Sequence, residues 1–265
     1  MKYGFIGGGN MGGAMAKAAI EVVGGANVLL CDRDEATTAA LAEKIGATPS
    51  TYEQIAAESR LIFVAVKPNL VAMVLEKLRP MLQSRASEVC VVSIAAGVTI
   101  ATMEGVLGGD IPLIRMMQNT PVAVGEGMMV YALSPAARAS DAAALEAAMS
   151  RAGKILPLEE KLIDAATAVM GCGPAFAYLF AEALADGGVA CGLTRAQAQV
   201  YAAQMLLGAA KMVLETGENP GALKDAVCSP GGSTIQGVRV LEEQAFRGAV
   251  IDAVIAAYQK TQGLG

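Results

Sequence analysis

Apolar residues in the N-terminal part of the chain come in short runs rich in valine, isoleucine and leucine, separated by longer stretches of mixed apolar and polar residues. The runs have the length of buried strands and lie at 3–6, 28–31, 61–66, 89–94 and 113–117. The mixed stretches have helical spacing and begin near Met11, Glu35, Asn69 and Thr99. This alternation predicts an α/β fold, with a Rossmann-like, doubly wound parallel sheet covered by helices on both faces. We expect two further strands, and a helix between them, at 125–133, 154–158 and 135–151.

The strand pattern stops after Glu159, and everything that follows has helical spacing. We therefore expect two domains, a dinucleotide-binding domain over 1–159 and an all-helical domain over 160–265. Thr194 has the position of an N-cap and Gly217 that of a C-cap, which predicts a helix of about six turns between them. Apolar residues occur around much of this helix, so it would be the centre of a monomeric bundle or would pack against a second subunit. We favour the second arrangement, because the helical part is too apolar to be left exposed.

The high apolar content requires a test for membrane spans, since hydrophobic residues make up 54% of the chain. The longest uncharged stretch, 165–181, is shorter than the roughly 20 residues that a spanning helix needs, and Gly171–Pro174 interrupts it. Lys2 is followed at once by a strand, a pattern that fits neither a signal peptide nor a transit peptide. These features predict a cytoplasmic protein that does not enter a membrane.

Charge and composition narrow the possible chemistry further. The net charge is −5 and no basic stripe is interleaved with aromatic residues, which argues against a nucleic-acid partner. The chain has no histidine, and its five cysteines are far apart, so we expect reduced thiols and no metal site. Catalysis would then depend on hydroxyls, carboxylates, lysines, thiols, backbone amides or a bound cofactor.

A glycine-rich turn follows the first predicted strand and opens the first helix, with Gly7, Gly9 and Gly12 in the spacing G-x-G-x-x-G. Gly7 permits the tight turn, Gly9 lets the backbone approach a pyrophosphate, and Gly12 allows close packing of helix on strand. Asn10 and Met11 begin the helix, whose N-terminal amides attract phosphates. The spacing alone is weak evidence, but its position between strand and helix predicts a nicotinamide dinucleotide site.

An acidic residue, Asp32, ends the second strand about twenty residues further on, where such a residue bonds the adenine ribose and favours NAD. Arg33 could instead hold the 2′-phosphate of NADP or lie against the adenine. A solvated turn with no ligand is the structural alternative for both residues. The cofactor is therefore expected to be NADP(H) or NAD(H), with the phosphate state left open.

Two more loops follow strands at the same carboxyl edge of the sheet, where ligands of doubly wound sheets bind. The first is Ala65, Val66, Lys67 and Pro68, and the second contains the small residues Ala95, Ala96 and Gly97, which would let a flat ring approach. Lys67 could also be an ordinary surface lysine, and the small residues could simply pack closely.

Together these stretches resemble pyrroline-5-carboxylate reductases, the enzymes of the last step of proline biosynthesis. The resemblance runs over nearly the whole chain, through 5–12, 65–68, 93–97, 115–121, 171–175, 182–186 and 215–241. The last stretch, which contains Ser-Pro-Gly-Gly-Ser-Thr at 229–234, is the most specific. The resemblance implies a cofactor domain, a helical domain that interlocks with its twin in a homodimer, and possible larger assemblies of dimers.

The resemblance also implies the site residues. Backbone amides at the start of a helix would hold the substrate carboxylate, and the hydroxyl of Thr234 would bond and polarise the ring nitrogen of the substrate; Asn119 would lie near the nicotinamide. The substrate loop would comprise Ser229, Gly231, Gly232, Ser233 and Thr234. Its structural alternative is a plain turn between helices, capped by Ser233 or Thr234. The chain departs from the family at Gln118, where proline is usual, and at Cys172-Gly173, where small hydroxyl residues are usual.

Rival interpretations come from three classes. The first is another Rossmann reductase acting on a hydroxy acid or a deazaflavin, which would need a helical-domain lysine such as Lys161, Lys211 or Lys224 as proton donor. The second is a dinucleotide-binding regulatory protein, and the third is a thiol redox sensor. The Ser-Pro-Gly-Gly-Ser-Thr loop has no role in the first and argues against the second, and the third is disfavoured because no two cysteines are close in sequence.

Overall fold

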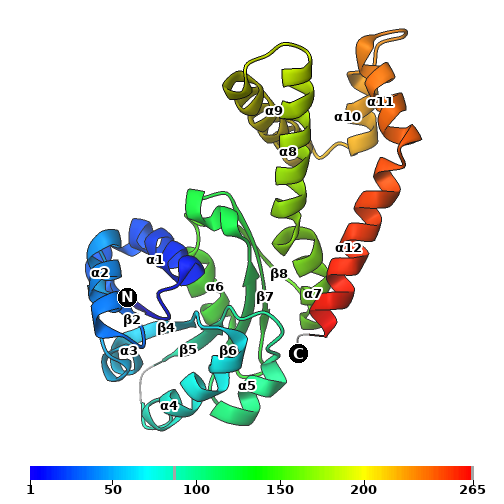
Figure 1. The fold of residues 1–265 in the computed structure, drawn as a ribbon. Helices are drawn as coiled ribbons and strands as arrows, with labels where there is room; N and C mark the ends of the chain where they lie inside the picture. Colours follow the sequence, from blue (N-terminus) through cyan, green and yellow to red (C-terminus); the bar gives the residue numbers. More distant parts are fainter. Residues whose placement is uncertain (86–87, 264–265) are drawn as a thin grey trace. The chain divides into compact units, whose positions relative to one another are not determined.

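The computed structural model describes residues 1–85 and 88–263 of the chain. It divides into two compact units, Met1–Cys172 with Ala257–Gly265, and Gly173–Ala256 (Figure 1). The expected domain boundary after residue 159 stays a prediction, because this division by contacts falls at a different place. Each unit is described by itself below.

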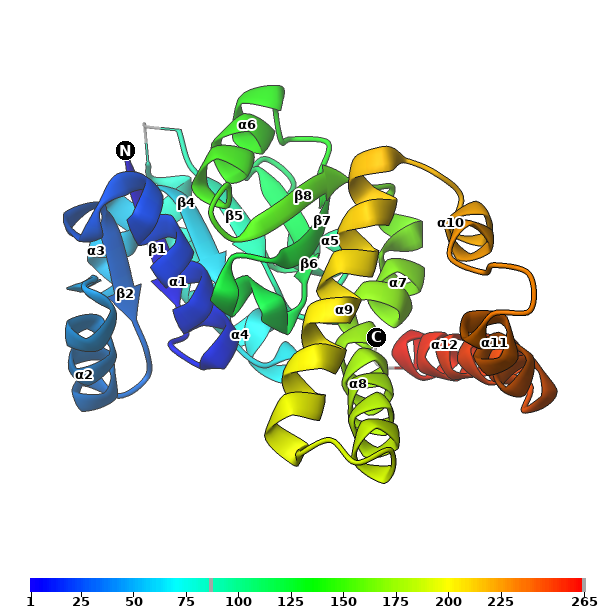
Figure 2. The same cartoon turned by 90° about the horizontal axis from the view of Figure 1, so that it is seen from above.

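The first unit is built on one sheet of eight strands in the order β3-β2-β1-β4-β5-β6-β7-β8 (Figure 2). Neighbouring strands pair in parallel except β6 and β7, which are antiparallel. The strands are β1 (Lys2–Ile6), β2 (Val28–Cys31), β3 (Thr48–Pro49), β4 (Ser59–Val64), β5 (Cys90–Ser93), β6 (Leu113–Gln118), β7 (Gly127–Leu133) and β8 (Gly153–Pro157). The doubly wound, mostly parallel fold that the alternation predicts is confirmed.

Helices cover both faces of this sheet, and each face has its own hydrophobic core. One core lies under α1, α2 and α6, and the other under α3, α4 and α5. Side chains of neighbouring strands reinforce the sheet, as where the rings of Phe5 and Phe63 stack with centroids 4.4 Å apart. The helices and short turns are α1 (Asn10–Val23), η1 (Gly25–Asn27), α2 (Glu35–Ile45), α3 (Tyr52–Glu58), η2 (Pro68–Leu70), α4 (Val71–Gln83), α5 (Ile100–Leu107), η3 (Thr120–Val124), α6 (Ala139–Ala148), η4 (Glu160–Leu162), α7 (Ile163–Ala166) and η5 (Thr167–Gly171).

The structure of this unit differs from the sequence analysis in three respects. The strand expected over 61–66 begins and ends earlier, at Ser59–Val64, so Ala65 and Val66 belong to the loop. β3 and α3 had no sequence prediction, since two residues and seven residues are too short to show a period. The sheet is not wholly parallel, because the short connection through η3 returns the chain beside β6 as an antiparallel partner, and a parallel crossover needs about a dozen residues.

A buried arginine ties β6 to the start of the helical part of the chain. Arg115 is 5% exposed and its guanidinium pairs with Asp164 at 2.8 Å and with Glu160 at 3.4 Å. Glu160 also accepts a hydrogen bond from the backbone N–H of Ile100 at 2.7 Å, at the first residue of α5. The carboxylates of Glu160 and Asp164 thus connect β6 and the start of α5 to the segment that begins the helical part of the chain.

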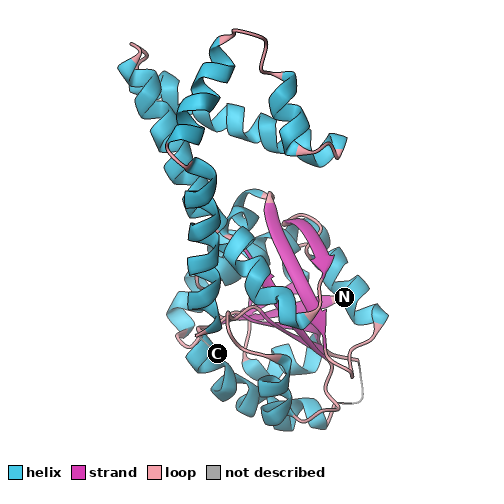
Figure 3. Ribbon diagram, turned by 90° about the vertical axis from the view of Figure 1, so that its right-hand side faces the viewer, coloured by secondary structure: helices cyan, strands magenta, loops and turns pink. Residues whose placement is uncertain are grey.

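The second unit is wholly helical, as the sequence predicts, and the strands are confined to the first unit (Figure 3). Its long helix begins after Thr194, whose hydroxyl forms a capping box with Gln197, and ends at Gly217, which has φ 69°, so the expected caps are confirmed. Helices α8 and α9 pack around Ala185, Ala198 and Ala202, which are the buried apolar residues of this unit. The helices are α8 (Gly173–Ala190), α9 (Arg195–Thr216), α10 (Pro220–Ala226), α11 (Ser233–Glu243) and α12 (Phe246–Gln262), the last of which ends in the first unit.

The expected interruption at Gly171–Pro174 is present as a local irregularity of the helix and not as a loop. The π-helical turn η5 ends at Gly171, Cys172 lies in a turn, and α8 begins at Gly173. By length and composition alone, the continuous stretch Glu160–Ala190 could cross a membrane, with 31 residues and a mean hydropathy of 1.4 in its most apolar window. The length of this stretch therefore does not argue against a membrane span. Its apolar side chains could be buried by lipid or by another protein surface, and length and composition do not distinguish the two.

Candidate active site

The glycine turn after β1 is packed on its inner side and open on its outer side. A Cβ on Gly7, whose φ is 108°, would lie 2.3 Å from the carbonyl oxygen of Ala65, and a Cβ on Gly12 would lie 2.2 Å from the carbonyl oxygen of Gly7. A Cβ on Gly9 would meet nothing within 4 Å. Gly7 and Gly12 are therefore required by close packing, while Gly9 faces open space that a ligand can enter.

The N-terminus of α1 is left without a partner from its own chain. Its N-cap is Gly9, which has no side chain to accept a hydrogen bond, and the first turn contains no acidic residue. The first backbone N–H groups of a helix lack intrahelical acceptors and carry partial positive charge. This end of α1, with Asn10 and Met11, fits the pyrophosphate of a dinucleotide.

Asp32 lies beside this turn and is held by backbone amides. Its Oδ2 accepts a hydrogen bond from the N–H of Gly8 at 2.6 Å, and its Oδ1 accepts one from the N–H of Arg33 at 2.7 Å. The N–H of Asp32 donates to the hydroxyl of Thr38 at 2.9 Å. The solvated turn considered for Asp32 is therefore wrong, because its carboxylate is half-buried and bonded to the glycine turn. Arg33 is exposed, as that alternative expects.

A cavity of about 810 Å³ extends from Asp32 and Arg33 along α3 and α4. Its wall contains Tyr52 and Lys77, and the Lys77 ammonium lies 3.8 Å from the centroid of the Tyr52 ring. Burial raises the pKa of Tyr52, and it raises the pKa of the Cys31 thiol against the opposing effect of Lys77. Sequence reasoning missed Tyr52 and Lys77, because α3 is too short to be recognised and a lysine on a helix surface has no distinguishing signal.

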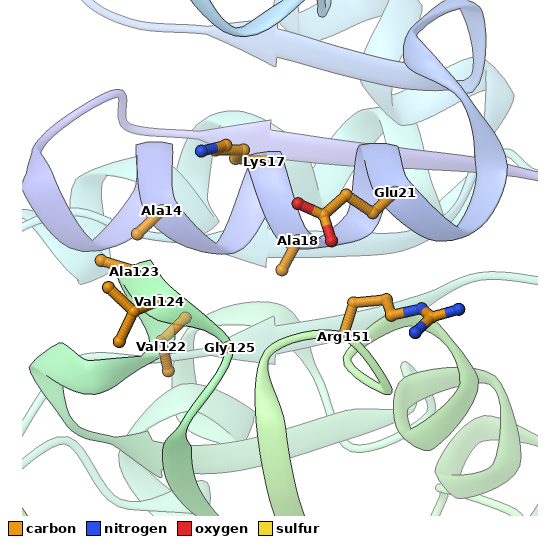
Figure 4. A pocket seen from close by; sticks show the side chains of 9 residues that line it. All are labelled: Ala14, Lys17, Ala18, Glu21, Val122, Ala123, Val124, Gly125 and Arg151. Atoms are coloured by element: carbon orange, nitrogen blue, oxygen red, sulfur yellow. The ribbon is translucent and has the colours of Figure 1, made fainter. Parts of the chain in front are cut away.

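A second, smaller cavity of about 250 Å³ lies between α1 and η3 (Figure 4). Lys17, Glu21 and Arg151 line it together with Val124, which is 76% exposed. Lys17 and Glu21 lie about two and about three turns beyond the N-terminus of α1, and no residue of the glycine turn lines this cavity. We assign it no part in dinucleotide binding.

The loops after β4 and β5 lie at the same edge of the sheet as the glycine turn. Ala65 pairs with the end of β1 through its N–H, which donates to the carbonyl of Ile6 at 2.8 Å. Val66 is half-buried, and Lys67 and Pro68 are exposed at the start of η2. In the loop after β5, Ala95 is buried, Ala96 and Gly97 are half-buried, and Gly97 has φ 77°.

The side chains of Gln118 and Asn119 brace this edge from β6. The amide nitrogen of Asn119 donates to the carbonyl of Met170 at 3.0 Å, and its oxygen accepts from the N–H of Met128 at 2.8 Å. Gln118 is 5% exposed, and its amide nitrogen donates to the carbonyl of Ile94 at 3.4 Å. A contact between Asn119 and a cofactor stays a prediction, since the carboxamide already joins β7 to the π-helical turn.

The Ser-Pro-Gly-Gly-Ser-Thr loop connects α10 to α11 in the second unit. Gly231 has φ 70°, and a Cβ on Gly232 would lie 2.5 Å from the hydroxyl oxygen of Ser229. Gly232 is the N-cap of α11 and provides no side-chain cap. The cap by Ser233 or Thr234 that the structural alternative expects is therefore wrong, and the N-terminus of α11 has no side-chain cap.

Thr234 lies in the first turn of α11 and is exposed. Within residues 1–85 and 88–263, no hydrogen-bond partner of its hydroxyl or of the Ser233 hydroxyl is found. An uncapped helix N-terminus with free hydroxyls beside it has the chemistry to bind a carboxylate.

Both the N-terminal and the C-terminal part of the chain match known protein families. Residues 160–264 match the family model for pyrroline-5-carboxylate reductase dimerisation, and residues 2–97 match that of coenzyme F420-dependent NADP oxidoreductases. The pyrroline-5-carboxylate reductase of Escherichia coli is 41% identical over 99% of this chain and 98% of its own. Pyrroline-5-carboxylate reductase 2 of Bos taurus is 42% identical over 100% of this chain and 84% of its own.

Solved structures lead to the same group. The pyrroline-5-carboxylate reductase of Coxiella burnetii superposes with a TM-score of 0.91 and 31% identity, over 100% of this chain and 98% of that one. The enzyme of Plasmodium falciparum, solved with NADP bound, superposes with a TM-score of 0.87 and 32% identity, over 100% of this chain and 98% of that one. The chain belongs to the pyrroline-5-carboxylate reductase family.

Proposed function

We propose that the protein reduces the cyclic imine 1-pyrroline-5-carboxylate to L-proline with NAD(P)H. The observation that carries the proposal is the uncapped N-terminus of α11 behind the Ser-Pro-Gly-Gly-Ser-Thr loop, in a chain that also has an open glycine turn at α1. The first supplies amides for a carboxylate and the second supplies amides for a dinucleotide. Membership of the pyrroline-5-carboxylate reductase family indicates the reaction between these two ligands, which is reduction of the imine by the dinucleotide.

The cofactor, when bound, supplies the hydride, and the protein supplies position and polarity. The residues proposed to hold it lie at the carboxyl edge of the sheet: Gly7, Gly9, Asn10, Met11, Gly12, Asp32, Arg33, Ala65, Val66, Lys67, Pro68, Ala95, Ala96, Gly97 and Asn119. The glycines admit the pyrophosphate, the carboxylate of Asp32 accepts from ribose hydroxyls, and the small residues after β5 leave room for a flat ring.

The substrate is held by the loop before α11. Amides of Gly231 and Ser233 bind the carboxylate. Gly232 lies between them, and its own N–H donates to the backbone carbonyl of Ser229 at 3.0 Å, which holds the loop in shape. Thr234 orients and polarises the ring nitrogen, because its hydroxyl is too weakly acidic to be a conventional proton donor. Fixing both ends of the substrate in this way orients the imine carbon for hydride transfer.

Replacement of Thr234 tests this role. Thr234→Ala should lower kcat by about 10- to 100-fold, the loss expected for one hydrogen bond to a charged group, and leave the Kd for NAD(P)H unchanged. Thr234→Ser keeps the hydroxyl and should recover most of the turnover. Wild-type turnover in Thr234→Ala would contradict the assignment.

The reaction itself is tested by steady-state oxidation of NADPH and NADH with pyrroline-5-carboxylate, with proline measured in the same sample. Tight dinucleotide binding without proline formation would favour the regulatory interpretation. The hydroxy-acid interpretation needs an available lysine. Lys161 and Lys224 are paired with Glu159 and Asp225 at 2.6 and 2.5 Å, whereas Lys211 has no ion-pair partner among the described residues, so turnover of a hydroxy acid in the same assay would favour that interpretation.

The C-terminal helices are proposed to form the homodimer interface. Large apolar side chains remain exposed over the second unit, including Leu179, Val200, Met212, Leu214, Val227 and Ile251. A monomer rarely leaves this much apolar surface in water. Burial against a second copy also accounts for the apolar stretch Glu160–Ala190, which lies in the region matched by the dimerisation family. Larger assemblies of dimers and a cytoplasmic location stay predictions.

A further inference from the structure

The turn between β2 and α2 contains three carboxylates where the adenine ribose of a dinucleotide is expected. They belong to Asp32, at the end of β2, to Asp34, and to Glu35, which begins α2. The Asp32 carboxylate is held toward the glycine turn by the N–H groups of Gly8 and Arg33. Each of its oxygens keeps a further lone pair with which to accept a hydrogen bond from a ribose hydroxyl.

The N-terminus of α2 is already occupied by a carboxylate of the chain. Asp34 is the N-cap, and its Oδ2 accepts hydrogen bonds from the backbone N–H of Thr37, at 2.9 Å, and from the Thr37 hydroxyl. These hydrogen bonds lower the pKa of the Asp34 carboxyl below its ordinary value, so it is ionised at neutral pH. The amides that would receive a phosphate at this helix end therefore face an anion instead.

The positive charge available against these carboxylates is small. Arg33 is exposed on the turn, and the Lys77 ammonium lies over the Tyr52 ring. A phosphate monoester adds nearly two negative charges at neutral pH. A 2′-phosphate at this turn would thus add its charge to a segment with three carboxylates, against two cations, the Arg33 guanidinium and the Lys77 ammonium, which line the same cavity as Asp32 and Glu35. Repulsion of this kind is an effective means of discrimination.

We propose that the β2–α2 turn selects NADH over NADPH, with Asp32 binding the ribose hydroxyls and Asp34 excluding a 2′-phosphate. The inference rests on the proposed function only for the class of cofactor. The proposal concerns the ratio of the affinities for NADH and NADPH. Both cofactors can use the glycine turn, and the N-terminal residues match a family of NADP oxidoreductases, so we do not expect NADPH binding to be absent.

Equilibrium binding to the full-length protein tests the inference without turnover. Dissociation constants are measured for NADH and NADPH, and for the fragments AMP and 2′,5′-ADP, which differ at the ribose in the same way. The wild-type protein should bind NADPH at least about tenfold more weakly than NADH, the effect of a modest uncompensated repulsion. The fragments should show the same order.

The informative variant is Asp34→Ser, because serine is as good an N-cap as aspartate and only the charge is removed. It should tighten NADPH and 2′,5′-ADP several-fold and leave NADH and AMP unchanged. Asp110→Ser removes one exposed carboxylate elsewhere and controls for net charge, so it should change none of the four constants.

Equal or tighter binding of NADPH by the wild-type protein would overturn the inference, as would an unchanged affinity ratio in Asp34→Ser. Binding of NADH with the expected preference, without reduction of pyrroline-5-carboxylate, would contradict the proposed function alone. Failure to bind either dinucleotide would overturn both.

Discussion

Gly12 packs so closely on Gly7 that a Cβ on Gly12 would lie 2.2 Å from the carbonyl oxygen of Gly7 and 2.9 Å from the Cβ of Ala65. A Cβ on Gly9, three residues earlier, would have no neighbouring atom within 4 Å. The two glycines thus serve different purposes in one turn: one lets the helix approach the sheet, and the other leaves space for a ligand.

Gly12→Ala should therefore destabilise the first unit by about 1–3 kcal/mol, as overpacking does, and abolish dinucleotide binding along with the turn. Gly9→Ala should keep the unfolding free energy within about 1 kcal/mol of the wild type. It should still weaken NADH binding, because a methyl group then stands where the pyrophosphate approaches. Denaturant unfolding and fluorescence titration measure the two effects, and equal stability of the two variants would contradict the packing argument.

Asp141 supports the opposite edge of the same sheet through a buried ion pair. Its side chain is 4% exposed and lies 2.6 Å from the guanidinium of Arg60, while its other oxygen accepts from the N–H of Arg138 at 2.7 Å, at the start of α6. Asp141→Ala leaves the Arg60 charge buried and α6 uncapped, and should cost about 3–5 kcal/mol of unfolding free energy.

Glu88→Ala provides the matched control, since Glu88 is 60% exposed and lies 3.6 Å from the same guanidinium. Its loss should cost at most about 1 kcal/mol. Denaturant unfolding measures both effects. Similar decreases in the free energy of unfolding of the two variants would show that the buried Arg60–Asp141 pair contributes no more to stability than the exposed pair.

Tyr131 should make the protein lose stability in alkali. Burial, with the hydrogen bond and negative charge of Glu146, raises its pKa from 10.0 to about 12. The folded state therefore retains a proton that the unfolded state releases, so this stabilisation is complete below pH 10 and is lost as the pH rises through about 12. Two units correspond to about 2–3 kcal/mol.

Tyr131→Phe removes this titration and controls for every other group that ionises in the same range. Its unfolding free energy should fall less steeply between pH 10 and 12 than that of the wild type. Parallel stability curves for the two proteins would refute the assignment.

The proposed dimer interface should be sensitive to charge on α9. Val200 and Leu214 are 63% and 69% exposed in the single chain, and burying a glutamate against a second copy is costly. Val200→Glu and Leu214→Glu should therefore shift the protein toward monomer in light scattering coupled to size exclusion. Val22→Glu alters an apolar residue of the first unit that is 38% exposed, and should leave the dimer intact. A dimer that survives both α9 substitutions would place the interface elsewhere.

Local signals in the sequence predicted those parts of the fold that depend on neighbouring residues. The β-branched runs marked β1, β2, β4, β5 and β6, and the caps at Thr194 and Gly217 marked the ends of α9, because strand burial and helix capping are decided within a few residues. The short elements β3 and α3 had no such signal. The direction of β7 was equally hidden, since strand pairing is decided by the length of a connection and by the packing around it.

In the candidate site, too, some features follow from local sequence and others only from the folded structure. The sequence by itself determined the glycine turn, the acidic end of β2 and the glycine-rich start of α11, because each of these needs particular residues at particular spacing. Only the tertiary structure decided that Asp32 is bonded to Gly8, that Lys77 lies over Tyr52 and that the Asn119 carboxamide joins Met128 to Met170. These contacts join segments that are distant along the chain, and no local pattern records which distant side chain the packing of the sheet and its helices will bring within hydrogen-bonding distance.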